Sequence, residues 1–410
     1  MGHSCRRSPN VVSVQNVFRP ERTPFSAPLP RQNPALKGFR SLAGGPLLPI
    51  GDYPEGDQVA RAAGQPTSVV AVYGVSPSAL PAPGVRMPGW GHWLPYLSWA
   101  SLGEGGTAAI DLPWSDVNPG LAGFWLKAEW TNPTGSHKDR MSPLAVARAR
   151  DVGARGVACA STGNAALSLA AYAAASGLRS RVVTTPAMPV ELRAALLRMD
   201  AILDDAPDAL ARWRRLGQLA QEGWFPVTNY ALPPVGSSAW GVEGYKTIAF
   251  ELAADPGGPL DAVVVPVARG DLLWGVGAGF VALAEAGHWK HPLPRLFGVE
   301  PFPRLAHVLA GKGRITDIFT GRTHQSSVSG ATLTDQTLRA VCDSGGDAVV
   351  VDDAAAESAR DALAGRGLIL ELCAAAAVAA VGKLHDTGRL PNSARVVAIG
   401  TAAAWYRPET

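Results

Sequence analysis

The stretch FWLKAEWTNPTGSHKDR (Phe124–Arg140) decides the fold class of this 410-residue chain. It begins as an apolar run typical of a buried strand, turns at Asn132-Pro133, and continues as a helical pattern. The stretch GVACASTGNAALSLAAYAAASG (Gly156–Gly177) repeats the same order of strand, polar loop and helix. Apolar strands that alternate with helices indicate a parallel sheet covered by helices on both faces, so the sequence predicts an α/β protein.

The same alternation continues through the rest of the chain. Further strands are expected at residues 181–185, 262–267, 295–300, 348–353 and 395–399, and helices at residues 139–152, 164–176 and 189–199. The apolar run Leu368–Val381 is expected to form a short strand followed by a buried helix. We expect two interleaved lobes within residues 86–410, the smaller at about 135–240, after an irregular extension over residues 1–85 that is rich in Pro, Gly and Arg.

Composition excludes several classes of protein. Lys and Arg number 37 and Asp and Glu 34, and a net charge of +3 is too small to indicate a nucleic-acid surface or a polybasic membrane anchor. Four scattered cysteines form no Cys-x-x-Cys pair, which predicts neither a metal site nor a disulfide framework and fits a reducing, cytoplasmic setting. The longest apolar run carries Glu371 and is too short to span a bilayer, and the N-terminal residues lack the apolar stretch of a signal peptide.

The first polar loop places a lysine at the start of a helix. Ser136 is a good N-cap residue, and Lys138 follows it in the first turn. Because the helix dipole disfavours a cation there, this position favours the free amine that Schiff-base chemistry needs. A lone lysine in this pattern also fits a solvated first turn, so the loop by itself leaves both interpretations open.

The second polar loop opens the next helix. Gly163 permits a close backbone approach, and the amides from Ser161 to Ala165 would form a site for a carboxylate or a phosphate at the helix N-terminus. An ordinary capped loop has a similar composition, so this loop too leaves two interpretations open.

Together the two loops resemble those of the pyridoxal-phosphate enzymes of the tryptophan-synthase-β fold (fold type II), and within them threonine synthase. The matching stretches are SLGEGGT (101–107), WLKAEWTNPTGSHKDR (125–140), CASTGNAALSLAAYAAASG (159–177) and VEGYKTIAFEL (242–252). Their order and spacing agree from about residue 90 to the end of the chain. The resemblance implies two interleaved parallel-sheet lobes, pyridoxal 5'-phosphate as the cofactor, an amino-acid substrate and a homodimer.

The resemblance also implies roles for particular residues. Lys138 would bind the cofactor through a Schiff base and then act as the base on the substrate Cα proton. Asn164 would lie against the 3-hydroxyl of the cofactor ring. The backbone of Ser161, Thr162 and Gly163 would bind the substrate carboxylate. No metal is expected.

One departure from the family lies in the loop expected to bind the cofactor phosphate. Of the family's glycine run only Gly270 remains, and Asp271 adds a negative charge. Arg269 can compensate through a bidentate contact with the phosphate, since guanidinium and phosphate geometries match. The alternative is that Arg269 pairs with Asp271. We expect Arg269 and Gly270 to bind the cofactor, helped by the N-terminus of the helix that follows.

Two further departures concern the pyridine nitrogen and the neighbour of the lysine. Fold type II enzymes place a Ser or Thr hydroxyl opposite the nitrogen. Strict register puts Ile399 there, whereas a shift of two residues makes it Thr401, which we expect to bind the cofactor. Glu371 is expected to be a structural acid at the sheet edge. His137 replaces a phenylalanine and either shuttles a proton or packs.

The last departure concerns the substrate. The arginine that binds the substrate phosphate in threonine synthases corresponds to Gly241, which makes a phosphorylated substrate less favoured. Lys246 faces either the cleft or the helix surface. The sequence predicts elimination or replacement at Cβ or Cγ of an amino acid, nearest to threonine synthase. The alternatives are a β-replacement or elimination on a serine-derived substrate, and a non-catalytic scaffold or ligand sensor.

Overall fold

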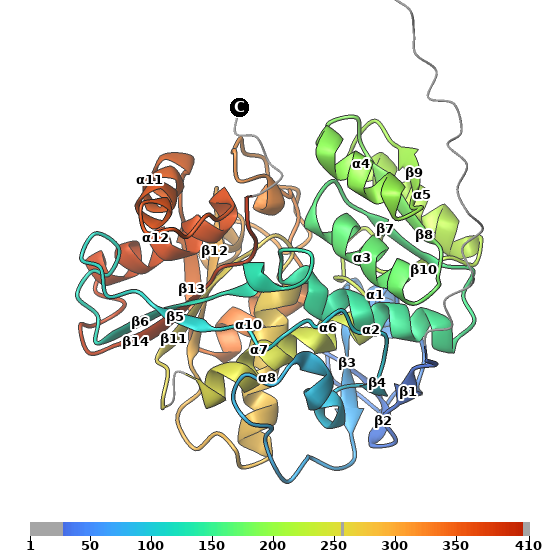
Figure 1. The fold of residues 1–410 in the computed structure, drawn as a ribbon, viewed down its shortest axis with the longest axis horizontal. Coiled ribbons are helices and arrows are strands. Elements are labelled where there is room, and N and C mark those ends of the chain that lie inside the picture. The colour runs from blue at the N-terminus through green and yellow to red at the C-terminus, as the bar shows by residue number, and fades with distance from the viewer. Residues whose placement is uncertain (1–27, 256–257, 405–410) are drawn as a thin grey trace, which may run out of the picture.

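The computed structural model describes residues 28–255 and 258–404, which form two lobes, each built around a sheet (Figure 1). The larger sheet contains, in spatial order, β13 (Asp347–Val350), β12 (Arg295–Glu300), β11 (Ala262–Pro266), β14 (Arg395–Ile399), β6 (Gly123–Lys127) and β5 (Ala109–Asp111). The smaller sheet contains β10 (Phe225–Pro226), β7 (Val157–Ala160), β8 (Ser180–Thr184) and β9 (Ile202–Asp205). All their pairings are parallel except that of β5 with β6.

The predicted α/β fold with two interleaved parallel-sheet lobes is confirmed. Each of the seven predicted strands is present, although the first ends at Lys127 and continues as a short 3-10 helix, η2 (Glu129–Thr131). The lobes interleave because β6 belongs to the larger sheet, although the chain builds the smaller sheet directly after it. Val-rich strands such as β11, whose residues are all buried, fit a sheet that is covered on both faces.

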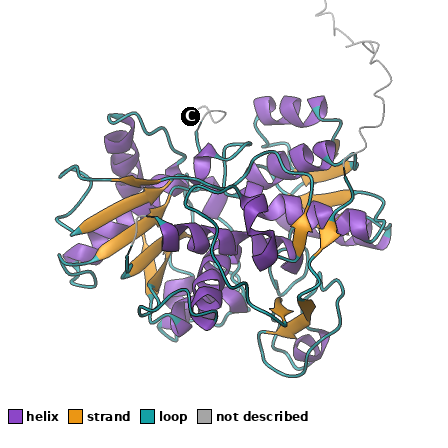
Figure 2. Ribbon diagram, turned by 60° about the horizontal axis from the view of Figure 1, so that its bottom comes forward, coloured by secondary structure: helices purple, strands orange, loops and turns teal. Residues whose placement is uncertain are grey.

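Helices cover both sheets (Figure 2). Between residues 87 and 254 these are α2 (Lys138–Asp151), α3 (Asn164–Ala175), α4 (Val190–Arg198), α5 (Ala209–Gln221), α6 (Ala239–Val242) and α7 (Lys246–Ala254), with η1 (Met87–Trp93) and η3 (Glu243–Tyr245). Between residues 271 and 386 they are α8 (Asp271–Glu285), α9 (Leu305–Leu309), η4 (Ser326–Val328), α10 (Asp335–Asp343), α11 (Asp353–Ala364) and α12 (Leu372–Asp386). None of the helices in the part of the chain that the structure describes is long and apolar enough to cross a membrane.

The run around Leu370 differs from its prediction. The expected buried helix is present as α12, but the expected strand is reduced to a single bridge between Leu370 and Ala403. The chain turns into α12 directly after this bridge, with Glu371 as the N-cap residue. The prediction of a strand there was wrong, because one apolar run contains both the bridge and the start of the helix.

Part of the predicted extension is ordered against the core. Residues 28–85 include β1 (Arg31–Gln32), β2 (Leu36–Ser41), α1 (Gln58–Ala62) and β3 (Val69–Tyr73), while β4 (Tyr96–Ser98) pairs with β1. β2 and β3 form an antiparallel pair whose buried side chains join the main hydrophobic core. This described part is therefore not the irregular extension that we expected. Residues 1–27 lie outside the described residues, and the boundary at residue 85 stays a prediction.

Candidate active site

The predicted lysine lies at the N-terminus of α2, close to the C-terminal ends of both sheets. Lys138 is the first residue of the helix, and its backbone amide donates to Ser136 Oγ at 3.3 Å. Its side-chain amine donates to the phenol oxygen of Tyr245 at 3.1 Å. Burial lowers the pKa of Lys138 to about 8, so at pH 7 about a tenth of this amine is free, far more than for an ordinary lysine.

The charges around this amine come from three other elements. Asp271 and Glu371 raise the pKa of Lys138, and Arg269 lowers it, but the effect of burial is larger than any of these. These residues lie at the start of α8, before α12 and in the loop after β11, respectively. The topology therefore gathers around Lys138 residues that lie more than a hundred positions away in the sequence.

Glu371 connects two of the predicted cofactor residues. Its carboxylate accepts from Thr401 Oγ1 at 3.2 Å, from Asn164 Nδ2 at 3.4 Å and from Ser327 Oγ at 3.1 Å. Ile399, by contrast, is fully buried in the hydrophobic core. The placement favours Thr401 over Ile399 as the residue beside the cofactor ring. Glu371, which we expected at the sheet edge as a structural acid, lies inside the site.

The loop after β7 opens α3 toward the same site. Ser161 Oγ accepts from the Gly163 amide at 3.2 Å, which fixes the turn. α3 begins at Asn164 without a side-chain cap. Within the described part of the chain, the buried Oδ1 atom of Asn164 has no hydrogen-bond donor. This amide oxygen is thus available to a ligand.

The loop after β11 is held by hydrogen bonds to its backbone carbonyl groups. The carbonyl of Val267 accepts from Arg304 Nη2 at 2.7 Å, and that of Ala268 accepts from Arg304 Nη1 at 3.2 Å. The carbonyl of Arg269 accepts from two threonine hydroxyls at 2.6 and 2.8 Å. Because the carbonyl and the amide of a trans peptide point in opposite directions, the next three amides face away from these partners. Successive amides with this orientation form a nest for an anion.

The end of this loop needs glycine. Gly270 has a φ of 81° and is the N-cap residue of α8, where no side chain caps the helix. A Cβ atom there would lie 2.0 Å from Thr337 Oγ1. Asp271 does not pair with Arg269, since its carboxylate accepts from the Ser237 hydroxyl at 2.6 Å and from Gln336. The alternative, an ion pair between Arg269 and Asp271, is therefore not formed.

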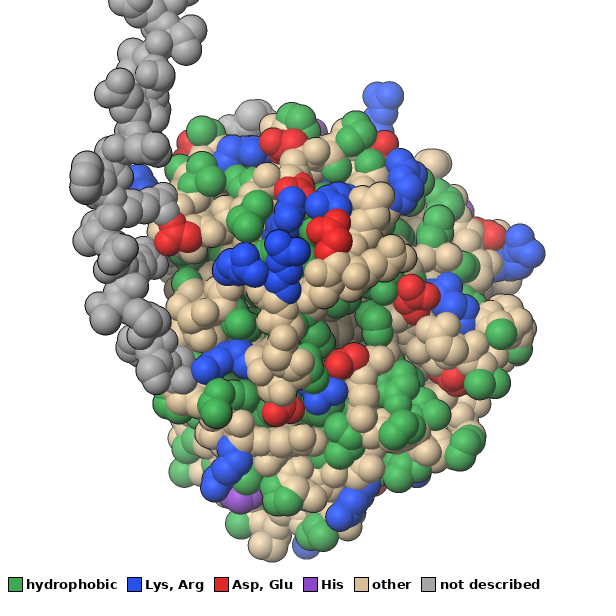
Figure 3. Space-filling model, turned by 90° about the vertical axis from the view of Figure 1, so that its right-hand side faces the viewer, with side chains coloured by type: hydrophobic (Ala, Val, Ile, Leu, Met, Phe, Trp, Pro, Cys, Tyr) green, Lys and Arg blue, Asp and Glu red, His purple; other side chains and the backbone are tan. Residues whose placement is uncertain are grey.

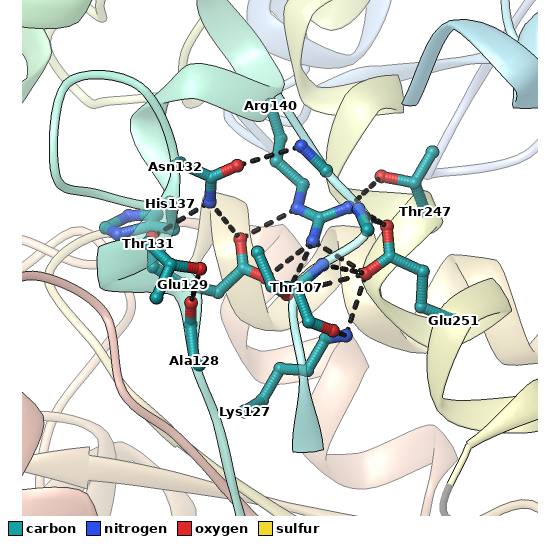
Figure 4. Close-up of polar contacts among 12 residues, drawn as sticks. Thr107, Lys127, Ala128, Glu129, Thr131, Asn132, His137, Arg140, Thr247 and Glu251 are labelled. Carbon is teal, nitrogen blue, oxygen red and sulfur yellow. Dashed lines mark hydrogen bonds and ion pairs between the residues drawn. The ribbon is translucent and has the colours of Figure 1, made fainter. Parts of the chain in front are cut away.

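A buried ion-pair network anchors the lysine loop (Figure 4). Arg140, two residues after Lys138, donates to both Glu129 oxygens at 2.6 and 2.7 Å and to both Glu251 oxygens at 2.5 and 2.9 Å. Lys127 donates to Glu251 at 2.7 Å. Two cations thus meet two carboxylates, and each charge is paired. The SLGEGGT stretch joins this network through its backbone amides.

Two further residues had roles that the sequence left open. His137 donates from Nδ1 to the Thr401 carbonyl at 3.1 Å, and burial holds its pKa well below the usual range. This neutral, anchored ring favours packing over the proton shuttle. Lys246 is buried and bound to Glu243 at 2.7 Å, so it does not lie on the helix surface. The sequence analysis missed this contact. The signal that could have indicated it is the spacing of three positions, which places the two residues on one helical face.

The residues gathered here fit pyridoxal phosphate. They supply a half-buried amine of lowered pKa, a buried amide oxygen without a donor, and an uncapped helix N-terminus beside an arginine. Lys138, Asn164 and Thr401 converge through Glu371, while the 161–163 loop and the 269–270 loop close two other sides. Sequence reasoning missed Glu371 as a member of the site.

Comparison with known proteins agrees with this fit. The sequence profile of the family described as "Pyridoxal-phosphate dependent enzyme" matches residues 100–402. The chain belongs to this family. Threonine synthase of Methanocaldococcus jannaschii is 30% identical over 325 residues, which cover 75% of this chain and 77% of that protein. Threonine synthase of Synechocystis sp. is 30% identical over 323 residues, covering 75% and 79%.

Solved structures of this pyridoxal-phosphate family share the fold. O-ureido-L-serine synthase superposes with a TM-score of 0.59 at 23% identity, covering 74% of this chain and 91% of that chain. Maize serine racemase superposes with a TM-score of 0.60 at 21% identity, covering 72% and 88%. At these identities the likeness concerns the fold alone.

Proposed function

We propose that this pyridoxal-phosphate dependent enzyme eliminates or replaces a substituent at Cβ or Cγ of an amino acid, with a reaction nearest to that of threonine synthase. The observation that carries the proposal is the half-buried amine of Lys138, with a pKa of about 8, placed 3.1 Å from the Tyr245 hydroxyl. An amine that is partly free near neutral pH can both attach a carbonyl group and accept a proton.

The residues of the chain divide the work. Lys138, Asn164, Thr401, Arg269 and Gly270 hold the cofactor, which when bound supplies the electron sink for carbanion chemistry. The backbone of the 161–163 loop binds the substrate carboxylate at the N-terminus of α3. This contact orients the substrate so that its Cα proton faces the Lys138 amine.

Tyr245 assists proton transfer at Lys138. Its phenol is buried, and burial raises its pKa well above the usual range, so the group stays protonated. It accepts the Lys138 hydrogen bond when the amine is charged and can donate to the amine nitrogen when it is neutral. Tyr245 thereby stabilises both states of the base. Thr401, held by Glu371 at 3.2 Å, positions a hydroxyl beside the cofactor ring.

A serine-derived substrate is the second candidate, and Gly241 favours it. A Cβ atom on Gly241 would lie 2.8 Å from Met141 Cγ and 3.0 Å from its carbonyl oxygen. An arginine at this position, as in threonine synthases, therefore has no room in this chain. A β-elimination or β-replacement needs only Lys138, the carboxylate loop and the cofactor. Assembly as a homodimer and a cytoplasmic location are further parts of this proposal.

The test combines a spectrum with a substrate comparison. Purified protein with added pyridoxal phosphate should show a visible band that borohydride bleaches, with the label on Lys138. The Lys138→Ala variant should lack the band, whereas Lys312→Ala, at an exposed position, should keep it. Conversion of O-phosphohomoserine to threonine and phosphate supports the reaction of threonine synthase, whereas loss of the β-substituent from an O-substituted serine supports the second candidate. A wild-type protein that never develops the band contradicts the proposal.

A further inference from the structure

Helix α5 carries two arginines with opposite surroundings. Arg215 is bound to Asp204 at 3.1 Å and to Glu222 at 2.7 Å. Arg212, one turn earlier, has no ion pair or side-chain hydrogen bond among the described residues, and its buried Nε atom lacks an acceptor. The Cys159 thiol nearby does not neutralise it, because burial raises the pKa of Cys159 to about 12.

Several arginines on the surface around α5 are bound to carboxylates. Figure 3 shows the side of the molecule that carries α4, α5 and β9, where Lys and Arg side chains lie beside Asp and Glu side chains. Arg181 is bound to Asp204 at 2.9 Å, and Arg193 is bound to Asp205 at 2.6 Å. Arg181, Arg193 and Arg215 thus have carboxylate partners, whereas Arg212 does not.

Arg269 is the second unpaired guanidinium, and it comes from the other lobe. Its Nε atom is buried without an acceptor within the described residues, and its guanidinium lies 5.5 Å from the ring centre of Trp213 on α5. Trp213 follows Arg212 directly, so the loop after β11 and the start of α5 meet at this point. Burial lowers the pKa of Arg212, and repulsion from Arg269 lowers it further.

The carboxylates nearest to the two guanidinium groups are engaged elsewhere. Asp271, close to Arg269, accepts from the amide and the hydroxyl of Ser237. Asp208, close to Arg212, caps the first turn of α5 with its side chain. Neither guanidinium therefore has a carboxylate acceptor within the described part of the chain. Burial lowers the pKa of both groups, and the nearby charges of Asp271 and Asp208 only act against this lowering. Buried N–H donors without an acceptor are costly unless a ligand accepts from them.

We propose that Arg212 and Arg269 together bind a phosphate dianion between the two lobes. A phosphate monoester carries close to two negative charges at neutral pH, which the two guanidinium groups balance. Guanidinium also matches phosphate geometry through bidentate contacts. The amides that face outward beside Arg269 add donors on the same side. Arg212 thus joins the site from α5, a helix to which the loop motifs gave no role.

The phosphate has two possible sources, the cofactor or the substrate. Its assignment to the cofactor rests on the proposed function, whereas the binding of inorganic phosphate does not. The probes are accordingly pyridoxal phosphate, pyridoxal without its phosphate, and inorganic phosphate. The variants are Arg212→Gln and Arg269→Gln, with Arg214→Gln, on the exposed side of α5, as the matched control.

Spectral titration measures the affinity of each variant for pyridoxal phosphate and for pyridoxal, and thermal unfolding with and without inorganic phosphate measures phosphate binding. Loss of one charge-assisted contact should weaken binding about tenfold or more. Without any ligand, Arg212→Gln should unfold no earlier than wild type, because it removes a guanidinium whose buried Nε atom has no acceptor.

Each outcome decides a part of the proposal. If both variants lose affinity for pyridoxal phosphate but keep that for pyridoxal, the site holds the cofactor phosphate. If cofactor affinities are unchanged while inorganic phosphate no longer stabilises the loaded protein, the site holds a substrate phosphate. If both variants behave like Arg214→Gln with all three probes, the proposal is overturned. A wild-type protein that binds phosphate but forms no visible band contradicts the proposed function and leaves the phosphate site standing.

Discussion

The Arg140 network and the Arg212–Arg269 pair show two ways in which this protein buries cations. Arg140 and Lys127 meet two carboxylates, and every charge has partners at 2.5–2.9 Å. The Nε atoms of Arg212 and Arg269 have no acceptor within the described residues, and the nearby carboxylates bind other groups. A network in which every donor has an acceptor holds the backbone in place. Guanidinium groups without an acceptor indicate where a ligand with the opposite charge binds.

The largest effect is expected when one cation is removed from the Arg140 network. Arg140→Met leaves Glu129 and Glu251 buried with one cation between them, and we expect a loss of about 3–5 kcal/mol in the free energy of unfolding. Urea denaturation measures this loss. The double variant Arg140→Met with Glu129→Gln keeps the Lys127–Glu251 pair and should recover part of the stability. No recovery would mean that shape rather than charge is decisive.

Acid should unbalance the same network reversibly. The pKa of Glu251 is lowered to about 2, mainly through Arg140 and then Lys127, against the burial that raises it. A lowered carboxyl pKa contributes stability above the unfolded value of 4.5, and this contribution is lost as the pH falls from there toward 2. Unfolding free energies between pH 6 and 3 should therefore fall less steeply in Glu251→Gln than in wild type. If the unfolding free energies of the variant and the wild type depend equally on pH, Glu251 does not contribute to the acid sensitivity.

Tyr245 allows a test of the hydrogen bond to the Lys138 amine. Tyr245→Phe removes the hydroxyl that lies 3.1 Å from the Lys138 amine but keeps the buried ring. We expect kcat to fall about tenfold, the value of one hydrogen bond, while the visible band of the bound cofactor remains. The pH profile of kcat should also shift, because the base loses its neutral partner. An unchanged profile with a lower kcat would reduce Tyr245 to a packing role.

The smallest expected effect is a shift in the titration of one amine. Burial lowers the pKa of Lys138 to about 8, so its charged form is disfavoured in the folded protein. Labelling of the cofactor-free protein with acetic anhydride, read by mass spectrometry, should reach half of its maximal rate at Lys138 near pH 8. Lys312, at an exposed position, serves as the internal control for the labelling reaction. Identical midpoints would contradict the burial of Lys138.

Local patterns made the fold and the two loops predictable. The strand, polar loop and helix around Lys138 and Asn164 are contiguous in the sequence, so periodicity and turn residues indicated them. The connection through Glu371 was not predictable, because it joins residues more than two hundred positions apart. The same holds for Arg212, since an arginine on an amphipathic helix is usually solvated and only its missing partners distinguish it. Burial and partner geometry are properties of the assembled chain.

The order of strands in the larger sheet has a consequence for biosynthesis. β14, near residue 400, lies between β11 and β6, and it pairs with β6 from Arg395 opposite Gly123. During synthesis β6 leaves the ribosome long before the strand that fills the gap beside it. The centre of this sheet is therefore completed late, and until then β6 and β11 each present an open edge that can pair with other chains. A ribosome that stalls before β14 leaves an exposed, apolar fragment for chaperones to bind.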